Sequence, residues 1–93
     1  MPKLMIPTPL RQYASQNDTV EVVAATVGDA LEKLTEQHVE LRQHLFNNEG
    51  KLRSFVNVYM NDEDIRYLQG LETGVDAADV ISIVPSIAGG LNV

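Results

Sequence analysis

Short runs along the chain alternate between apolar and polar residues with a period of two, which is the pattern of half-buried β-strands. These runs predict strands over residues 3–6, 19–24, 55–60 and 80–84. The first run stops at Pro7-Thr8-Pro9, because proline cannot donate a hydrogen bond to a strand ladder. The first two runs can pair as a hairpin across the loop between them. The last run, Val80-Ile81-Ser82-Ile83-Val84, is almost continuously apolar, which is typical of a central strand covered on one face.

A helical period replaces the alternation after the second run. Thr26-Val27-Gly28-Asp29 is a typical helix start, since the Thr26 hydroxyl can cap the helix and Asp29 can complete a capping-box contact. Apolar residues then recur at helical spacing and predict an amphipathic helix with one buried stripe: Val27, Ala30, Leu31 and Leu34. A second apolar set predicts a further turn or short helix: Val39, Leu41, Leu45 and Phe46.

The order of elements points to one fold. After the third strand, Asn61–Asp64 is a polar turn, and residues 65–67 are predicted to return as a short fourth strand. The order is then strand, strand, helix, strand, strand, strand. With a right-handed crossover this favours an α+β fold of the β-grasp (ubiquitin-like) type, a mixed sheet of about five strands with one main helix packed on one face. We expect one domain over residues 1–86 and a flexible C-terminal arm over residues 87–93.

The C-terminal arm is the most informative feature of the chain. Ile87-Ala88-Gly89-Gly90 follows the last strand, and only Leu91-Asn92-Val93 comes after it. Glycine has no side chain, so a narrow channel of a partner can admit the backbone as far as the last carbonyl. Such an arm suits a protein whose own C-terminal carboxylate reacts, and here three residues block the carboxylate of Gly90. The alternative interpretation is a frayed terminus that contains two glycines.

Composition narrows the function classes. The chain has 93 residues, a formal net charge of −6 and no cysteine, so disulfides, a cysteine nucleophile and a thiolate metal site are excluded. An acidic balance argues against binding to nucleic acid. No apolar run approaches the ~20 residues that span a membrane, and we expect a cytoplasmic protein.

Other polar residues give no pattern of a catalytic or metal site. His38 and His44 are six residues apart and do not share a helical face. Asn61–Asp64 lacks the ligand spacing of a calcium loop. The serines have no base and orienting group beside them, so we predict no catalytic residue and no metal ligand. Tyr13, Tyr59 and Tyr67 are interpreted as packing residues rather than as a stacking platform.

Three segments carry a resemblance to a known family. They are Ile6–Arg11, Phe55–Arg66 and Ile83–Gly90. With these segments in this order and spacing, the chain resembles the ThiS/MoaD-type ubiquitin-like sulfur carriers, and among them the CysO-type carriers of cysteine biosynthesis, over nearly its whole length. Carriers of this family usually end at the second glycine, so this chain departs from the pattern by its three-residue extension.

The resemblance implies a function and partners. It implies a precursor from which a JAMM-type zinc metalloprotease removes Leu91-Asn92-Val93 by cutting between Gly90 and Leu91. An E1-like enzyme, using ATP and magnesium, then adenylates the Gly90 carboxylate, and a sulfur donor converts it into a thiocarboxylate. A PLP-dependent cysteine synthase-like enzyme accepts the sulfur. Threading into these partners would involve Pro85, Ile87, Ala88 and Gly89. The carrier itself would be no enzyme and would bind no cofactor.

Alternatives within the same fold remain open. They are the small subunit of molybdopterin synthase, a ubiquitin-like protein modifier, and a plain interaction domain whose tail is never cut. The sulfur-containing product could be cysteine, homocysteine or another thiolated metabolite. Apolar strand residues on the face away from the helix could form a docking patch for partner enzymes, but the sequence does not separate them from the core.

Overall fold

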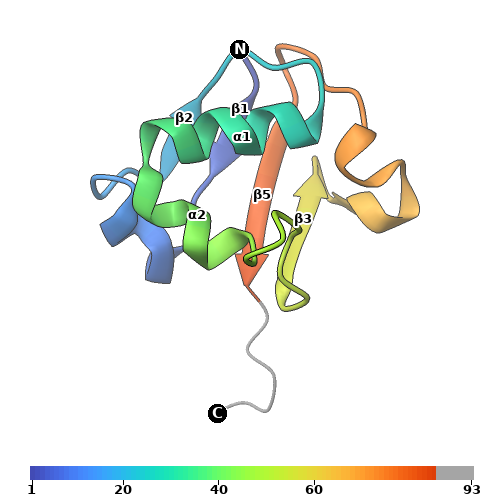
Figure 1. Cartoon of the computed structure of the whole chain (residues 1–93). Coiled ribbons are helices and arrows are strands. Elements are labelled where there is room, and N and C mark those ends of the chain that lie inside the picture. The colour runs from blue at the N-terminus through green and yellow to red at the C-terminus, as the bar shows by residue number, and fades with distance from the viewer. Residues whose placement is uncertain (86–93) are drawn as a thin grey trace.

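The structure is a computed structural model and describes residues 1–85. A five-stranded mixed sheet forms one of its layers (Figure 1). The spatial order of the strands is β2-β1-β5-β3-β4. Their bounds are β1 (Lys3–Met5), β2 (Thr19–Glu21), β3 (Val56–Met60), β4 (Glu63–Asp64) and β5 (Val80–Pro85). Strand β1 runs parallel to β5, and the other neighbouring strands are antiparallel. The predicted β-grasp arrangement is confirmed, with β5 at the centre of the sheet.

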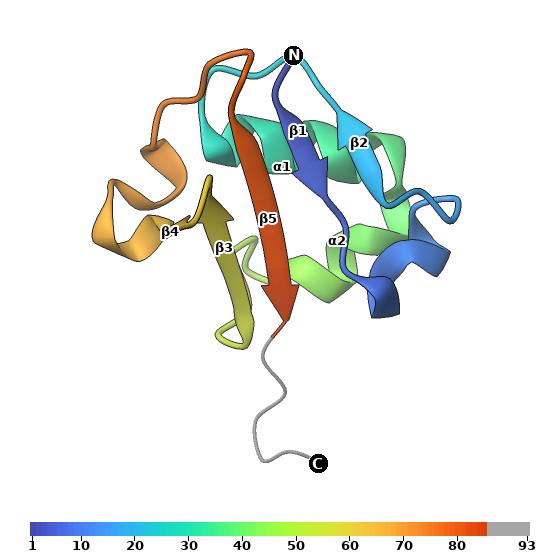
Figure 2. The same ribbon diagram turned by 180° about the vertical axis from the view of Figure 1, so that it is seen from behind.

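Helices cover only one face of this sheet, as the view from behind shows (Figure 2). The α-helices are α1 (Val27–Gln37) and α2 (Val39–Leu45), and three short 3₁₀-helices are η1 (Thr8–Tyr13), η2 (Ile65–Tyr67) and η3 (Gly70–Glu72). The predicted cap of α1 is confirmed, because the Thr26 hydroxyl accepts a hydrogen bond from the Asp29 amide at 3.0 Å. The Asp29 carboxylate accepts from the amide of Ala25 at 3.3 Å, one residue earlier than in a regular capping box. None of the helices in the described part of the chain is long and apolar enough to cross a membrane.

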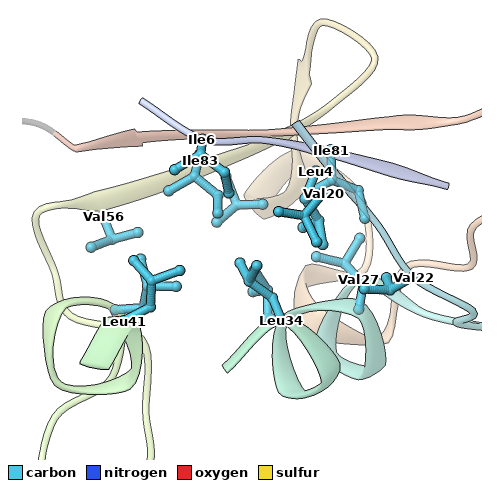
Figure 3. Close-up of a cluster of buried hydrophobic side chains, with 14 of the residues drawn as sticks. Leu4, Ile6, Val20, Val22, Val27, Leu34, Leu41, Val56, Ile81 and Ile83 are labelled. Carbon is cyan, nitrogen blue, oxygen red and sulfur yellow. The ribbon is translucent and has the colours of Figure 1, made fainter. Parts of the chain in front are cut away.

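The core lies between the sheet and the two α-helices. In Figure 3, Leu34 and Leu41 point from α1 and α2 toward Ile83 of the sheet. Leu4 pairs with Ile81 of β5 and with Val20 of β2, so the inner residues of three strands form one apolar row. The predicted stripe of α1 is buried along its whole length: Val27, Ala30, Leu31 and Leu34. Each fully buried Leu or Ile stabilises the fold by roughly 1.5–3 kcal/mol, so this single apolar layer dominates the stability.

Two predictions about strands need correction. The fourth strand is not at residues 65–67: β4 is Glu63–Asp64, and Ile65–Tyr67 forms the 3₁₀-helix η2. The cause is local, because the Asp64 carboxylate accepts the backbone N–H of Arg66 at 2.8 Å and starts a helical turn where alternation suggested an extended segment. The second strand is also shorter than predicted and ends at Glu21. Residues 87–93 lie outside the described part, so the predicted division into domain and arm stays a prediction.

Candidate functional site

Strand β5 ends where the described part of the chain ends, and this point is the base of the predicted site. The residues predicted for threading and cleavage beyond it lie outside the described residues: Ile87, Ala88, Gly89, Gly90 and Leu91. Pro85, the last described residue, pairs with Val56 of β3 and ends the strand. With β1 on one side and β3 on the other, β5 is held by two neighbours, so the base of the arm has a fixed position and direction.

The opposite end of β5 is fixed by a small polar network. Asn61, with a positive φ of 54°, accepts the N–H of Val80 through its side-chain oxygen at 3.0 Å. Its amide nitrogen donates to Asp79 at 3.1 Å, and Asp79 also accepts the N–H of Asp76 at 2.7 Å. That backbone hydrogen bond, with the Asn61 amide, lowers the pKa of the Asp79 carboxyl. The turn between β3 and β4 therefore holds the start of the strand that leads to the tail.

The face of the sheet away from the helices carries an exposed apolar patch, which we call the outer patch, formed by Met5, Tyr59 and Val84. Met5 and Val84 are 40% and 44% exposed. Ser82 lies between Met5 and Tyr59 in the strand register. A shallow cavity of about 400 Å³ is lined by Tyr59, Ser82 and Val84 with Asp62. The sequence did not distinguish the apolar residues of this patch from those of the core. The structure does, since Ile81 and Ile83 face the helices and the residues of the outer patch lie on the opposite face.

The edge of the sheet beside Tyr59 is held by an ion pair. Asp64 is buried and contacts the Arg66 guanidinium through Nε and Nη2, the shorter distance being 2.7 Å. Hydrogen bonds from the Arg66 side chain and backbone hold the pKa of the Asp64 carboxyl below its ordinary value. Tyr67 next to this pair is 81% exposed, so its interpretation as a packing residue is wrong.

The helices at the tail-exit end hold the two histidines apart. His44 of α2 stacks on Tyr13 of η1 with ring centroids 4.2 Å apart, which ties α2 to η1. His38 caps the junction between α1 and α2 through its backbone N–H, which donates to Leu34. Among residues 1–85, no group of three or more His, Asp or Glu side chains is arranged to hold a metal ion.

Comparison with known proteins agrees with this architecture. The model of the ThiS family matches residues 4–90. The sulfur carrier protein CysO of Mycobacterium tuberculosis is 36% identical over 87 residues, which cover 91% of this chain and 94% of that protein. The small archaeal modifier protein 3 of Haloferax volcanii is 36% identical over 66 residues, 71% of either chain.

Solved structures show the same fold. A chain of the crystal structure of the Amycolatopsis orientalis BexX/CysO complex superposes with a TM-score of 0.87 and 38% sequence identity. The match covers 97% of this chain and 100% of that one. The family model, the sequence relative and the structure each extend over more than nine-tenths of the chain, and together they settle its membership: the chain belongs to the ThiS family.

Proposed function

We propose that this protein is the precursor of a sulfur carrier that bears sulfur as a thiocarboxylate on Gly90. The observation that carries the proposal is the joint match to CysO sulfur carriers over nearly the whole chain, in which Gly89-Gly90 follows the central strand in the sequence. The structure contributes the rigid base of the arm at Pro85 and an uncovered outer patch beside it. A carrier needs both, because a partner must grip the domain while its active site holds the tail.

Chemistry at Gly90 begins with removal of Leu91-Asn92-Val93, for which we propose a JAMM-type zinc metalloprotease. A free carboxylate is a poor acyl donor because oxide is a poor leaving group. In the proposed sequence, an E1-like partner lets the carboxylate oxygen attack the α-phosphorus of ATP, and pyrophosphate leaves. Magnesium and basic groups of the partner stabilise the charge on the phosphates. A sulfur donor at the oxidation level of sulfide, as HS⁻, then attacks the acyl carbon, AMP leaves, the S–H proton is lost to water, and the thiocarboxylate remains.

A tethered thiocarboxylate is a useful form of sulfur. It is nucleophilic at neutral pH and stays attached to a folded domain, which raises its effective concentration in the site of an acceptor enzyme. We propose a PLP-dependent synthase as the acceptor and cysteine or homocysteine as the product. In this role the protein is a co-substrate in the cytoplasm rather than an enzyme, and it holds no cofactor of its own.

A second candidate is a protein modifier whose Gly90 is joined to lysines of target proteins. The observation that favours it is the match to small archaeal modifier protein 3 of Haloferax volcanii. Isopeptide-linked ladders in host lysate, absent when Gly90 is changed, would favour this candidate. The small subunit of molybdopterin synthase is the remaining alternative and would co-purify with a large catalytic subunit.

Intact-mass measurement of the protein purified from its own host tests the proposal. We expect a species that ends at Gly90, part of which is heavier by the difference between one sulfur and one oxygen atom. Gly90→Val should abolish the heavier species, because a branched side chain blocks entry into a narrow activating channel. Gly74→Val is the matched control, since a Cβ there meets only the backbone oxygen of Ala25 at 3.9 Å.

Two results would contradict the proposal. One is a single full-length mass in cells grown under sulfur demand, which would mean that Gly90 never becomes a terminus. The other is a heavier species whose fragment masses place the extra sulfur on a residue other than Gly90.

A further inference from the structure

The end of the domain from which the tail leaves differs in charge from the rest of the protein. Segments 6–18 and 38–55 surround this end, where α2 lies beside the end of β5 in both views (Figures 1 and 2). They hold four of the seven Lys and Arg residues but only three of the 13 Asp and Glu residues. Their net charge is therefore +1, while the remainder of the chain carries −7. A partner that receives the tail meets an end whose net charge is opposite in sign to that of the whole protein.

Two arginines in this region are held in place by backbone carbonyls. The Nε of Arg53 donates to the carbonyl of Gln43 at 2.9 Å, and the Nε of Arg11 donates to that of Ile6 at 3.0 Å. Within residues 1–85 neither guanidinium lies within 4.0 Å of a carboxylate oxygen. Because both side chains are already held, binding a partner would cost them little additional conformational entropy. Their positive charge is not neutralised by an ion pair inside the described domain.

A cavity of about 500 Å³ lies between α2 and the segment that follows it, and we call it the α2 pocket. Arg42 and Arg53 both line it, together with Glu40, Phe46 and Val39, which is 72% exposed. The Arg42 guanidinium lies 5.1 Å from the centroid of the Phe46 ring, an arrangement that orients it by a cation–π contact. The pocket therefore combines two guanidinium groups and one carboxylate with apolar side chains, so its lining keeps a net positive charge.

The α2 pocket is close to the exit of the tail. The carbonyl of Arg53 accepts the N–H of Val56 at 3.0 Å, and Val56 pairs with Pro85 in the sheet. One turn of chain and one strand pairing thus separate Arg53 from the last described residue. A protein that encloses the chain beyond Pro85 comes within reach of this pocket.

We propose that the α2 pocket binds a segment of the enzyme that adenylates the tail. This segment carries a carboxylate for the guanidinium groups and an apolar side chain that packs against Val39. The inference rests on the proposed function. Guanidinium groups match carboxylates in geometry and form bidentate charge-assisted hydrogen bonds. Acidic groups around the mouth of the partner's channel attract this end of the carrier and repel its acidic remainder, so the tail arrives first.

Steady-state kinetics of the carrier ending at Gly90 with the E1-like enzyme of its host test the proposal, with ATP–pyrophosphate exchange as the readout. Arg42→Glu is the test variant, and Lys33→Glu is its matched control. Each residue is an exposed helical cation with one carboxylate partner: Arg42 is 46% exposed and lies 3.3 Å from Glu32, and Lys33 is 41% exposed and lies 3.9 Å from Asp29. Both substitutions change the net charge equally, but only Arg42→Glu removes a side chain of the α2 pocket, with its contacts to Phe46 and Thr35.

We expect Arg42→Glu to raise the KM for the carrier about tenfold at low salt with kcat unchanged, and Lys33→Glu to change it less than about twofold. The difference should shrink as salt screens the charges. Urea unfolding checks that each variant is folded, and Arg42→Gln replaces Arg42→Glu if the latter is not. Equal KM values for the two variants would overturn the proposed role of the α2 pocket in binding the enzyme, while leaving the proposed function intact. Absence of exchange with the unchanged carrier would overturn the proposed function and this inference with it.

Discussion

Strand β5 has two faces with opposite environments, although its residues alternate along one short segment. Ile81 and Ile83 are 0% and 3% exposed and lie under the helices, whereas Val84 is 44% exposed on the outer face. Ser82 occupies the outer face between Met5 and Tyr59. The inner residues of one strand therefore hold the domain together, while its outer residues stay exposed on the free face of the sheet.

The largest expected difference in unfolding free energy is between truncation of a residue on the inner face of β5 and truncation of one on its outer face. Ile81→Ala removes a fully buried side chain that pairs with Leu4 and should lower the free energy of unfolding by about 2–5 kcal/mol. Val84→Ala is the matched change on the outer face and should lower it by about 0.5 kcal/mol or less. Urea unfolding of the two variants measures both values. Comparable losses from the two truncations would show that the outer face also contributes to the core, and the division of the strand would fail.

The sequence was sufficient to predict the features that depend on local pattern. The burial of Leu31 and Leu34 follows from a period of 3.6, and the cap at Thr26 follows from its hydroxyl and its place before the helix. The order of the elements then restricts the topology, because a right-handed crossover leaves few arrangements for a sheet of five strands. These features need no knowledge of distant contacts, which explains why they were predicted correctly.

Features that depend on distant contacts or on competition between local structures were missed. The parity of β5 places Ile81 and Val84 on opposite faces, but only the helix packing decides which face is buried. At residues 65–67 an apolar–polar alternation competed with the side chain of Asp64, which accepts the N–H of Arg66 and starts a 3₁₀-helix. The pairing of Arg42 and Arg53 around one cavity joins residues 11 positions apart and has no sequence signal of its own.

Removal of the N-terminal cap of α1, the helix that covers the inner face, should have an intermediate effect on the unfolding free energy. Thr26→Ala leaves the Asp29 amide without its hydrogen bond and should lower the free energy of unfolding by about 1 kcal/mol. Thr26→Ser keeps a hydroxyl at the same position and is the matched control, with a loss of less than half as much. Thermal or urea unfolding distinguishes the two. An equal loss in both variants would assign the effect to the methyl group of Thr26 rather than to the cap.

The ion pair at the edge of the sheet should give the smallest effect and a characteristic pH dependence. Asp64 is buried, but its partner Arg66 is 68% exposed, so water screens the pair. The hydrogen bonds from Arg66 lower the pKa of Asp64 in the folded protein. A lowered pKa means that the folded state favours the ionised carboxylate, so its stabilising contribution is present above the unfolded-state pKa of about 4 and is lost as the pH falls through the folded value.

Asp64→Asn lacks the titrating group, and the difference in unfolding free energy between the two proteins should be constant near neutral pH and shrink below about pH 4. Urea unfolding at pH 7 and pH 3 measures it, with Asp62→Asn on the neighbouring turn as the matched control, since Asp62 has no ion-pair partner among residues 1–85. A difference for Asp64→Asn that stays constant down to pH 3 would mean that the carboxylate acts only as a neutral cap of η2, through the hydrogen bond that an asparagine oxygen can also accept.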